Sequence, residues 1–307
     1  MFTIGIDGGG SNLRVVVVDD ALTILAQTTM VGTANPSVIG RDAAALLVQD
    51  AMRTVIAAAP DQPIVAVGIG IAGAAPAYAA DWLHEIVKAV LPTTLVVPAT
   101  DVEMALVGAH GARRGVIVMA GTGSVAYGVS ETGEGLQVGG WGYLLGDEGS
   151  GYWLGLKALQ GLTLWSDNKI DVFYAVAHFV MQELQLSSPK EVIPWLYRTP
   201  PPTHEVAALA SLMLMLAEEG NLYAKGAINE AAGYLAGMIA RLKNRLALTD
   251  PPIAFGGGLL TNPDPLNYTN PLMRALRGRL GLEHYPETLY PPVIGAALLA
   301  QIRARGG

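Results

Sequence analysis

The chain has 307 residues, of which 51% are hydrophobic and 15% are charged, so it can form two domains with a sizeable core and is too apolar to be disordered. Its net charge of −7 argues against nucleic acid or an anionic membrane as a partner. The absence of cysteine excludes disulfides, a thiolate nucleophile and a cysteine-held metal cluster. The uncharged run 64–80 is short for a membrane span, and Asp7 interrupts the first apolar run, so we expect a cytoplasmic protein without a secretory signal.

Apolar strands alternate with helices in the first half of the chain. This alternation predicts an α/β fold with a largely buried sheet. The expected strands lie at 3–7, 14–18, 24–30, 64–71 and 94–98, and the expected helices at 41–59, 77–90 and 102–109.

The second half opens with two strands within 115–129 and is then rich in helices. The expected helices lie at 151–164, 171–185, 205–219, 222–248 and 271–280, with a strand at 253–255. No low-complexity linker separates the halves, so we expect a hinge near Arg113 to Gly115. The apolar richness of the chain would permit a homodimer.

Two strand–glycine–strand hairpins recur at a constant offset. The first turn is Asp7-Gly8-Gly9-Gly10-Ser11 and the second is Gly121-Thr122-Gly123-Ser124. Glycine-rich turns leave backbone N–H groups free to face an anion, so duplicated halves could grip a polyphosphate from two sides. The only basic residues near either hairpin are Arg14, Arg113 and Arg114. The pattern predicts a nucleotide held largely by backbone amides and a metal ion.

Other nucleotide motifs are weaker. No lysine has the glycine before it and the Ser or Thr after it that a Walker A loop requires. Gly68, Gly70 and Gly73 form a G-x-G-x-x-G after a strand, but the acidic residue expected about 20 positions later is missing. A nicotinamide-dependent oxidoreductase is therefore an alternative with little support. The five histidines are scattered without ligand spacing, and we assign them no metal role.

The motifs taken in order resemble the N-acetylglucosamine kinases of the BadF/BadG/BcrA/BcrD ATPase family, within the actin/hexokinase/Hsp70 superfamily. The resemblance covers nearly the whole chain, and its most specific part is the long glycine-rich string at 139–151. The motifs that carry it are Asp7-Gly8-Gly9-Gly10-Ser11, Thr100-Asp101, Ala120-Gly121-Thr122-Gly123-Ser124, Gly139-Gly140-Trp141-Gly142-Tyr143-Leu144-Leu145-Gly146-Asp147-Glu148-Gly149-Ser150-Gly151 and Phe255-Gly256-Gly257-Gly258.

The resemblance implies two duplicated ribonuclease H-like lobes with a cleft between them. The N-terminal lobe would comprise 1–113, with 293–307 returning to it, and would carry the sugar and first phosphate sites. The C-terminal lobe would comprise 114–292 and carry the second phosphate site and the adenosine site.

The resemblance also assigns residues to ATP and Mg²⁺. Asp7 would help to place Mg²⁺, although a turn-capping role is the simpler alternative. The glycine turn at 256–258 would face adenosine, or serve only as a tight strand–helix turn. The residues expected to contact the nucleotide are Gly9, Gly10, Ser11, Asn12, Gly121, Thr122, Gly123, Gly256, Gly257 and Gly258.

Asp101 matches the general base of the family. At a helix N-terminus it should stay ionised, and it could accept a proton late in a loose phosphoryl-transfer transition state. The alternative is a simple N-cap. Asn35 is expected at the sugar or in an ordinary turn before Pro36, and Trp141 as a sugar platform or in core packing. The full set expected at the substrate is Asn35, Thr100, Asp101, Ser124, Trp141, Gly142, Asp147 and Glu148.

The resemblance implies ATP-dependent phosphorylation of a small amino sugar at its 6-hydroxyl. N-acetylglucosamine is the first expectation, with N-acetylmuramic acid and glucosamine as alternatives. A non-catalytic nucleotide or sugar sensor is an alternative of another class, against which the retained Asp101 argues. Members that activate dehydratases need a cysteine-held iron–sulfur cluster, which a cysteine-free chain cannot build.

Two positions depart from the family pattern. Leu13 stands where a second hydroxyl is common, so one phosphate contact is in doubt. The base motif reads Thr100-Asp101-Val102 rather than Asn-Asp-Ala, so hydrogen bonds to the sugar could differ.

Overall fold

The computed structural model describes residues 1–10, 12–197, 203–261, 270–284 and 286–306, which form two compact units. Unit 1 comprises residues 1–117, 129–134 and 287–307, and unit 2 comprises residues 118–128 and 135–286.

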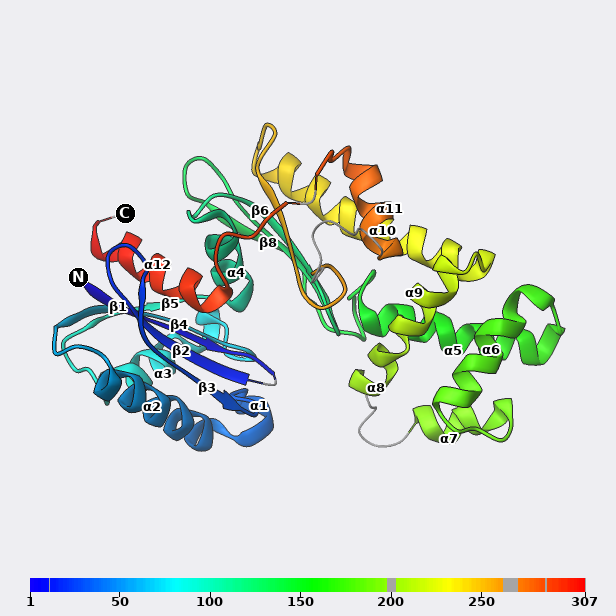
Figure 1. Cartoon of the computed structure of the whole chain (residues 1–307), viewed down its shortest axis with the longest axis horizontal. Helices are drawn as coiled ribbons and strands as arrows, with labels where there is room; N and C mark the ends of the chain where they lie inside the picture. The colour runs from blue at the N-terminus through cyan, green and yellow to red at the C-terminus, as the bar shows by residue number, and fades with distance from the viewer. Residues whose placement is uncertain (11, 198–202, 262–269, 285, 307) are drawn as a thin grey trace. The chain divides into compact units, whose positions relative to one another are not determined.

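Unit 1 is built on a five-stranded sheet with the order β3-β2-β1-β4-β5 (Figure 1). Its strands are β1 (Phe2–Gly8), β2 (Asn12–Val18), β3 (Ile24–Val31), β4 (Ile64–Ile71) and β5 (Leu95–Pro98). The strands β1, β2 and β3 pair antiparallel, whereas β4 is parallel to both β1 and β5. The carboxyl ends of β1, β4 and β5 therefore meet at one edge of the sheet.

One face of this sheet is covered by α2 (Arg41–Ala58) and α3 (Pro76–Lys88). Alternate strand residues such as Ile4 and Ile6 pack there with Met52 and Leu83, all with no exposed surface. The period of two in β1 places Thr3, Gly5 and Asp7 on the opposite face.

The opposite face is covered by α4 (Asp101–His110) and α12 (Pro292–Ala304), and glycines permit the close approach. A Cβ at Gly5 would lie 2.0 Å from the Val293 carbonyl oxygen, and a Cβ at Gly68 would lie 1.9 Å from that of Ala296. Likewise, a Cβ at Gly295 would lie 2.0 Å from the Met104 carbonyl oxygen of α4. Backbone thus packs on backbone, which no larger residue would allow.

Unit 2 contains a four-stranded sheet with the order β8-β7-β6-β9. Its strands are β6 (Gly115–Ala120), β7 (Ser124–Val129), β8 (Gly135–Gly139) and β9 (Ile253–Gly256). The first residues of β6 and the last residue of β7 belong to unit 1. The order β8-β7-β6-β9 repeats β3-β2-β1-β4 of unit 1. In both sheets the second and third strands lie on one side of the first strand, and a later strand lies on its other side. The predicted duplicated α/β fold is confirmed.

Most of the other described residues of unit 2 are helical. They are α5 (Gly151–Asn168), α6 (Asp171–Glu183), η1 (Pro189–Glu191), α7 (Val192–Leu196), α8 (Thr203–Ala208), α9 (Ala210–Glu218), α10 (Leu222–Arg245) and α11 (Pro271–Leu280). Within the described part of the chain, no helix combines the length and apolar character that crossing a bilayer requires.

The single helix predicted over 205–219 is wrong. The structure has α8 and α9, separated at Leu209, where the Ser211 hydroxyl donates to the Ala208 carbonyl oxygen (2.7 Å). Such a local side-chain bond competes with helical pairing of the backbone. Helix α10 ends at Arg245 rather than at 248, because Ala247 adopts a left-handed conformation (φ 51°). The short helix α1 (Pro36–Ile39), strand β8 and helices α7 and α12 were not predicted.

Replacing Gly68 with alanine tests the close packing of α12. The added methyl would meet the Ala296 carbonyl oxygen of α12, so either the helix or the strand must shift. We expect the free energy of unfolding to fall by about 2 kcal/mol or more in urea titrations. Gly226→Ala is the matched control, because Gly226 lies inside α10 with open space around it. This control should raise stability by about 1 kcal/mol, and equal effects of the two changes would contradict the packing argument.

Candidate active site

The carboxyl-terminal edge of the unit 1 sheet gathers polar groups. Asp7 lies near the end of β1, and Asp101 begins α4 just after β5. The loop before α1 lies against the same edge, because a Cβ at Gly8 would lie 3.2 Å from the Ala34 Cβ. Ligands of α/β sheets bind at this edge of the strands.

Asp7 is a buried carboxylate with a nearby cation. It is 8% exposed, and burial raises its pKa from 3.8 to about 6, an effect opposed by Arg14 and reinforced by the charge of Asp101. Arg14 is the register partner of Asp7 on β2, and its Nη1 lies 3.7 Å from Asp7 Oδ2. Asp7 sits within β1, one residue before its end, with its carboxylate beside Arg14.

Asp101 is the first residue of α4, and the cap is its neighbour Thr100. The Thr100 hydroxyl accepts from the Glu103 amide (3.1 Å), and Asp101 Oδ1 accepts from the Val102 amide (2.9 Å). The N-cap interpretation of Asp101 is therefore wrong, and the helix begins one residue earlier than predicted. The carboxylate is exposed at the positive end of the helix.

Asn35 caps α1 and packs beside β4. Its Oδ1 accepts from the Ser37 amide (2.9 Å), so the turn interpretation describes its present contacts. A Cβ at Gly73 would lie 2.3 Å from the same oxygen, which places the half-buried Asn35 side chain at the edge that carries Asp7.

The G-x-G-x-x-G motif is explained by packing. Gly68 and Gly70 lie inside β4, not in a turn, and face Ala296 and Met104 of the covering helices. Gly73 accommodates Asn35. The structure gives the dinucleotide alternative no support.

The first glycine hairpin joins β1 to β2. The Gly9 amide donates to the Asn12 carbonyl oxygen (2.9 Å), and a Cβ at Gly10 would meet nothing within 4 Å. Ser11 lies outside the described residues.

In unit 2, the second hairpin is anchored to the start of α5. The Gly121 carbonyl oxygen accepts from the Gly151 amide (2.7 Å), and that of Thr122 accepts from the Tyr152 amide (3.1 Å). The turn after β9 packs on the same hairpin, because a Cβ at Gly257 (φ 82°) would lie 2.4 Å from the Ala120 carbonyl oxygen. Gly257 must therefore be glycine for both conformation and space.

These elements line a cavity of about 390 Å³ in unit 2. It extends from the second glycine hairpin to the predicted adenosine turn, although Gly256 and Gly257 are not among its lining residues. The lining residues are Gly121, Thr122, Gly151, His204, Ala207, Ala208, Gly258 and Leu259. Sequence reasoning missed His204 and its neighbours on α8, since no motif links that helix to the hairpin.

The glycine-rich loop 139–149 follows β8. Trp141 is 74% exposed, so its core-packing interpretation is wrong. Leu144 and Leu145 are also exposed, whereas Asp147 is buried and accepts from the Ser124 amide (3.2 Å) through Oδ1. Burial raises the pKa of Asp147. Gly142 (φ 82°) is exposed, and Glu148 is half-buried.

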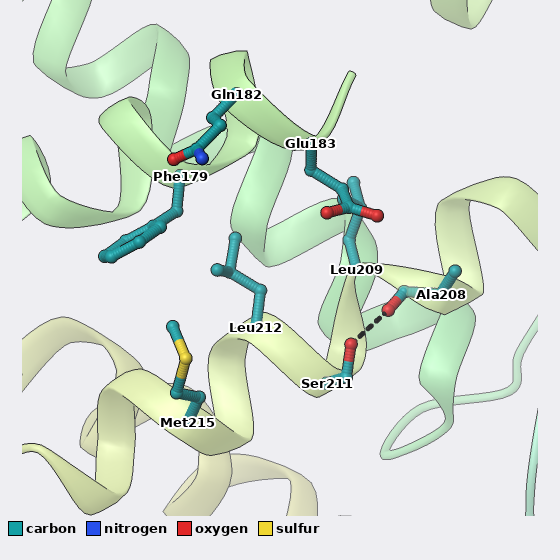
Figure 2. Close-up of a pocket in the computed structure, with 8 residues that line it drawn as sticks. All are labelled: Phe179, Gln182, Glu183, Ala208, Leu209, Ser211, Leu212 and Met215. Atoms are coloured by element: carbon teal, nitrogen blue, oxygen red, sulfur yellow. Dashed lines mark hydrogen bonds between the residues drawn. The ribbon is translucent and has the colours of Figure 1, made fainter. Parts of the chain in front are cut away.

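A second cavity, of about 320 Å³, lies between α6 and α9 and contains none of the predicted site residues (Figure 2). Its walls are mainly apolar, formed by Phe179, Leu212 and Met215. Ser211 at its rim is already bonded to Ala208.

Asp7 fits a hydrated Mg²⁺ ion. Its pKa is raised by burial, so a cation would supply charge that Arg14 only partly provides. Across the described residues, no three histidine, aspartate or glutamate side chains gather as a ready-made metal cluster. Mg²⁺ commonly needs only one or two carboxylates and takes the rest of its ligands from water and phosphate.

Comparison with known proteins gives a consistent family. Residues 4–300 match the model of the BadF/BadG/BcrA/BcrD ATPase family. The chain is 27% identical over 271 residues to the N-acetylmuramic acid/N-acetylglucosamine kinase of Clostridium acetobutylicum, covering 87% of each protein. It is also 27% identical to the N-acetyl-D-glucosamine kinase of Dictyostelium discoideum, covering 97% of each. A solved structure of a candidate N-acetylglucosamine kinase from Chromobacterium violaceum superposes with a TM-score of 0.73 at 25% identity, covering 97% of this chain and 98% of that one.

Replacing Asp7 with asparagine should stabilise the fold at neutral and alkaline pH. The pKa of Asp7 is about 6 in the folded state and 3.8 in the unfolded chain. Ionisation of Asp7 therefore lowers the free energy of unfolding as the pH rises through this window. Removing the charge should raise the free energy of unfolding by up to about 3 kcal/mol at pH 8 and by less than about 1 kcal/mol at pH 4. Urea titrations at both pH values measure this difference. The exposed Asp61→Asn is the control for the same change in net charge, and an equal gain in both variants would contradict the burial argument.

Proposed function

The chain belongs to the BadF/BadG/BcrA/BcrD ATPase family, and from this premise we propose that it is an ATP-dependent kinase that phosphorylates an amino sugar at the 6-hydroxyl. N-acetylglucosamine is the proposed substrate, because both curated relatives described above are named as kinases of it. The observation that carries the proposal is the pair Asp7 and Asp101 at the carboxyl-terminal edge of unit 1, close enough for their charges to interact.

Asp101 acts as the general base in this proposal. Its carboxylate is exposed at the N-terminus of α4, the positive end of the helix dipole. The sugar 6-oxygen attacks the γ-phosphorus, the bond from phosphorus to the bridging oxygen of ADP breaks, and Asp101 accepts the hydroxyl proton late in the transition state. Because Thr100 provides the cap, the Asp101 side chain is left to reach substrate.

The nucleotide is held mainly by backbone amides. We assign the phosphates to Gly9, Gly10 and Asn12 in unit 1 and to the hairpin 121–123 in unit 2, and adenosine to the turn 256–258. The 390 Å³ cavity beside this hairpin and turn supports the second assignment. Mg²⁺ held through Asp7 would neutralise charge that develops on the phosphates.

The sugar is assigned to Asn35 and Thr100 in unit 1 and to Ser124 and the loop residues Trp141, Gly142, Asp147 and Glu148 in unit 2. The exposed faces of Trp141 and Leu144 suit the apolar ring face and an acetyl methyl group. These apolar surfaces favour an N-acetylated sugar over glucosamine, which has no acetyl methyl group. The carboxylates would pair with sugar hydroxyls.

A sugar panel tests the activity and the substrate together. We expect ADP release with Mg-ATP and N-acetylglucosamine, and mass spectrometry should identify its 6-phosphate as product. Glucosamine, N-acetylmuramic acid and glucose complete the panel and rank the alternatives. If none of the four sugars becomes phosphorylated, the proposed function is wrong and a sensor or a simple ATPase gains support.

Replacing Asp101 with asparagine separates a kinase from a sensor. We expect kcat to fall by about a hundredfold to ten-thousandfold, since the amide cannot accept the proton. Calorimetry should show sugar and nucleotide binding largely retained. Asp42→Asn is the matched control, because Asp42 also lies in the first turn of a unit 1 helix, and its kcat should stay within about twofold of the parent value. Full turnover by the Asp101 variant would exclude Asp101 as the base.

A further inference from the structure

The loop 139–149 and the phosphate hairpin 121–124 are joined near both ends of the loop. At the start of the loop, the Gly140 amide donates to the Ser124 carbonyl oxygen (3.0 Å). Just beyond its end, the Gly151 amide donates to the Gly121 carbonyl oxygen (2.7 Å). The loop proposed to bind sugar and the hairpin proposed to bind phosphate thus share backbone contacts at both ends.

The centre of this junction is the Asp147 carboxylate. Its Oδ1 accepts from the Ser124 amide (3.2 Å), while the Ser124 hydroxyl donates to the Glu148 carbonyl oxygen (2.9 Å). Gly123 makes room for the carboxylate, since a Cβ there would lie 2.7 Å from Asp147 Oδ2. Asp147 and Ser124 are only 8% and 3% exposed, so these bonds are shielded from water.

Asp147 adopts an unusual backbone conformation. Its φ of 61° lies in the left-handed region, which costs free energy for a non-glycine residue but is tolerated by aspartate and asparagine. Within the loop, Gly140, Gly142 and Gly149 also have positive φ, but position 147 carries a side chain. The conformation persists because the surrounding hydrogen bonds hold it.

We propose that Asp147 is a positioning residue that holds the phosphate hairpin in its nucleotide-binding arrangement, in addition to any contact with sugar. A carboxylate has about four acceptor directions, so a bond to the Ser124 amide leaves others for a sugar hydroxyl. One side chain then serves both ligands. By linkage, sugar binding at Asp147 must change nucleotide affinity by the same factor as nucleotide binding changes sugar affinity.

The proposal rests on the nucleotide role proposed for the hairpin, and it goes beyond the sugar-ligand role expected for Asp147. The two roles make different predictions when sugar is absent. A residue that only binds sugar leaves nucleotide affinity unchanged, whereas a residue that positions the hairpin alters it.

The test measures calorimetric affinity for ADP with Mg²⁺ in the full chain, without sugar and then with saturating N-acetylglucosamine. Asp147→Gly removes the carboxylate and fits the left-handed conformation, so we expect ADP to bind about tenfold more weakly without sugar. Asp147→Asn retains an acceptor for the Ser124 amide, and its ADP affinity should stay within about threefold of the parent value. The effect of sugar on ADP affinity should be lost in the glycine variant.

Asp250→Gly is the matched control, because Asp250 is an exposed aspartate that also has a positive φ (47°). It should bind ADP as the parent does. Ser124→Ala removes only the hydroxyl bond to Glu148 and provides a second variant if Asp147→Gly fails to fold. It should weaken ADP binding about fivefold, more than the change allowed for Asp147→Asn.

Parent-like ADP affinity in Asp147→Gly, or in Ser124→Ala, would overturn the positioning role. ADP binding needs no sugar product, so the result stands even if the sugar panel fails. A parent chain that does not bind ADP would instead overturn the nucleotide role of the hairpin, and this proposal with it.

Discussion

Helix α12 rests on the bare backbone of β1 and β4, and the arrangement of unit 1 depends on that contact. Gly5 and Gly68 bring carbonyl groups of the helix to where side chains would otherwise stand. Gly295 brings α12 equally close to α4. Because α4 is fixed by this packing, its first residue, Asp101, is held at the sheet edge where Asp7 lies near the end of β1. The packing of α12 therefore fixes the position of Asp101 at the start of α4.

At that edge, the burial of Asp7 is only partly compensated by the positive charge of Arg14. Asp7 is nearly buried and has Arg14 as a distant partner, so its pKa is raised. A carboxylate in this state favours a cation, which suits the assigned role in placing Mg²⁺. The proposed role in placing Mg²⁺ would account for the stability lost by ionising Asp7, a trade-off common at active sites.

Unit 2 repeats the sheet order but uses its hairpin differently. In unit 1 the hairpin turn after β1 is open around Gly10, whereas in unit 2 the hairpin 121–124 is fastened to the loop 139–149 and to α5. The elements that pack on each glycine hairpin therefore determine whether its turn is open or held by hydrogen bonds. Sugar and nucleotide contacts assigned to this unit pass through the two neighbours Gly123 and Ser124, which offers a short physical route for coupling them.

Local pattern in the sequence determined strands β1 to β7 and β9, the two glycine hairpins and the family, because alternation of apolar residues and glycine turns is encoded over a few neighbouring positions. It also pointed to Asp7 and Asp101. Tertiary packing alone decided that Gly68 and Gly70 serve helix packing rather than a dinucleotide, and that Trp141 is exposed. It also decided that His204 lines the cavity and that Asp147 bonds to Ser124. Each of these depends on contacts between residues far apart in the chain, and spacing along a single sequence carries no record of which distant groups meet.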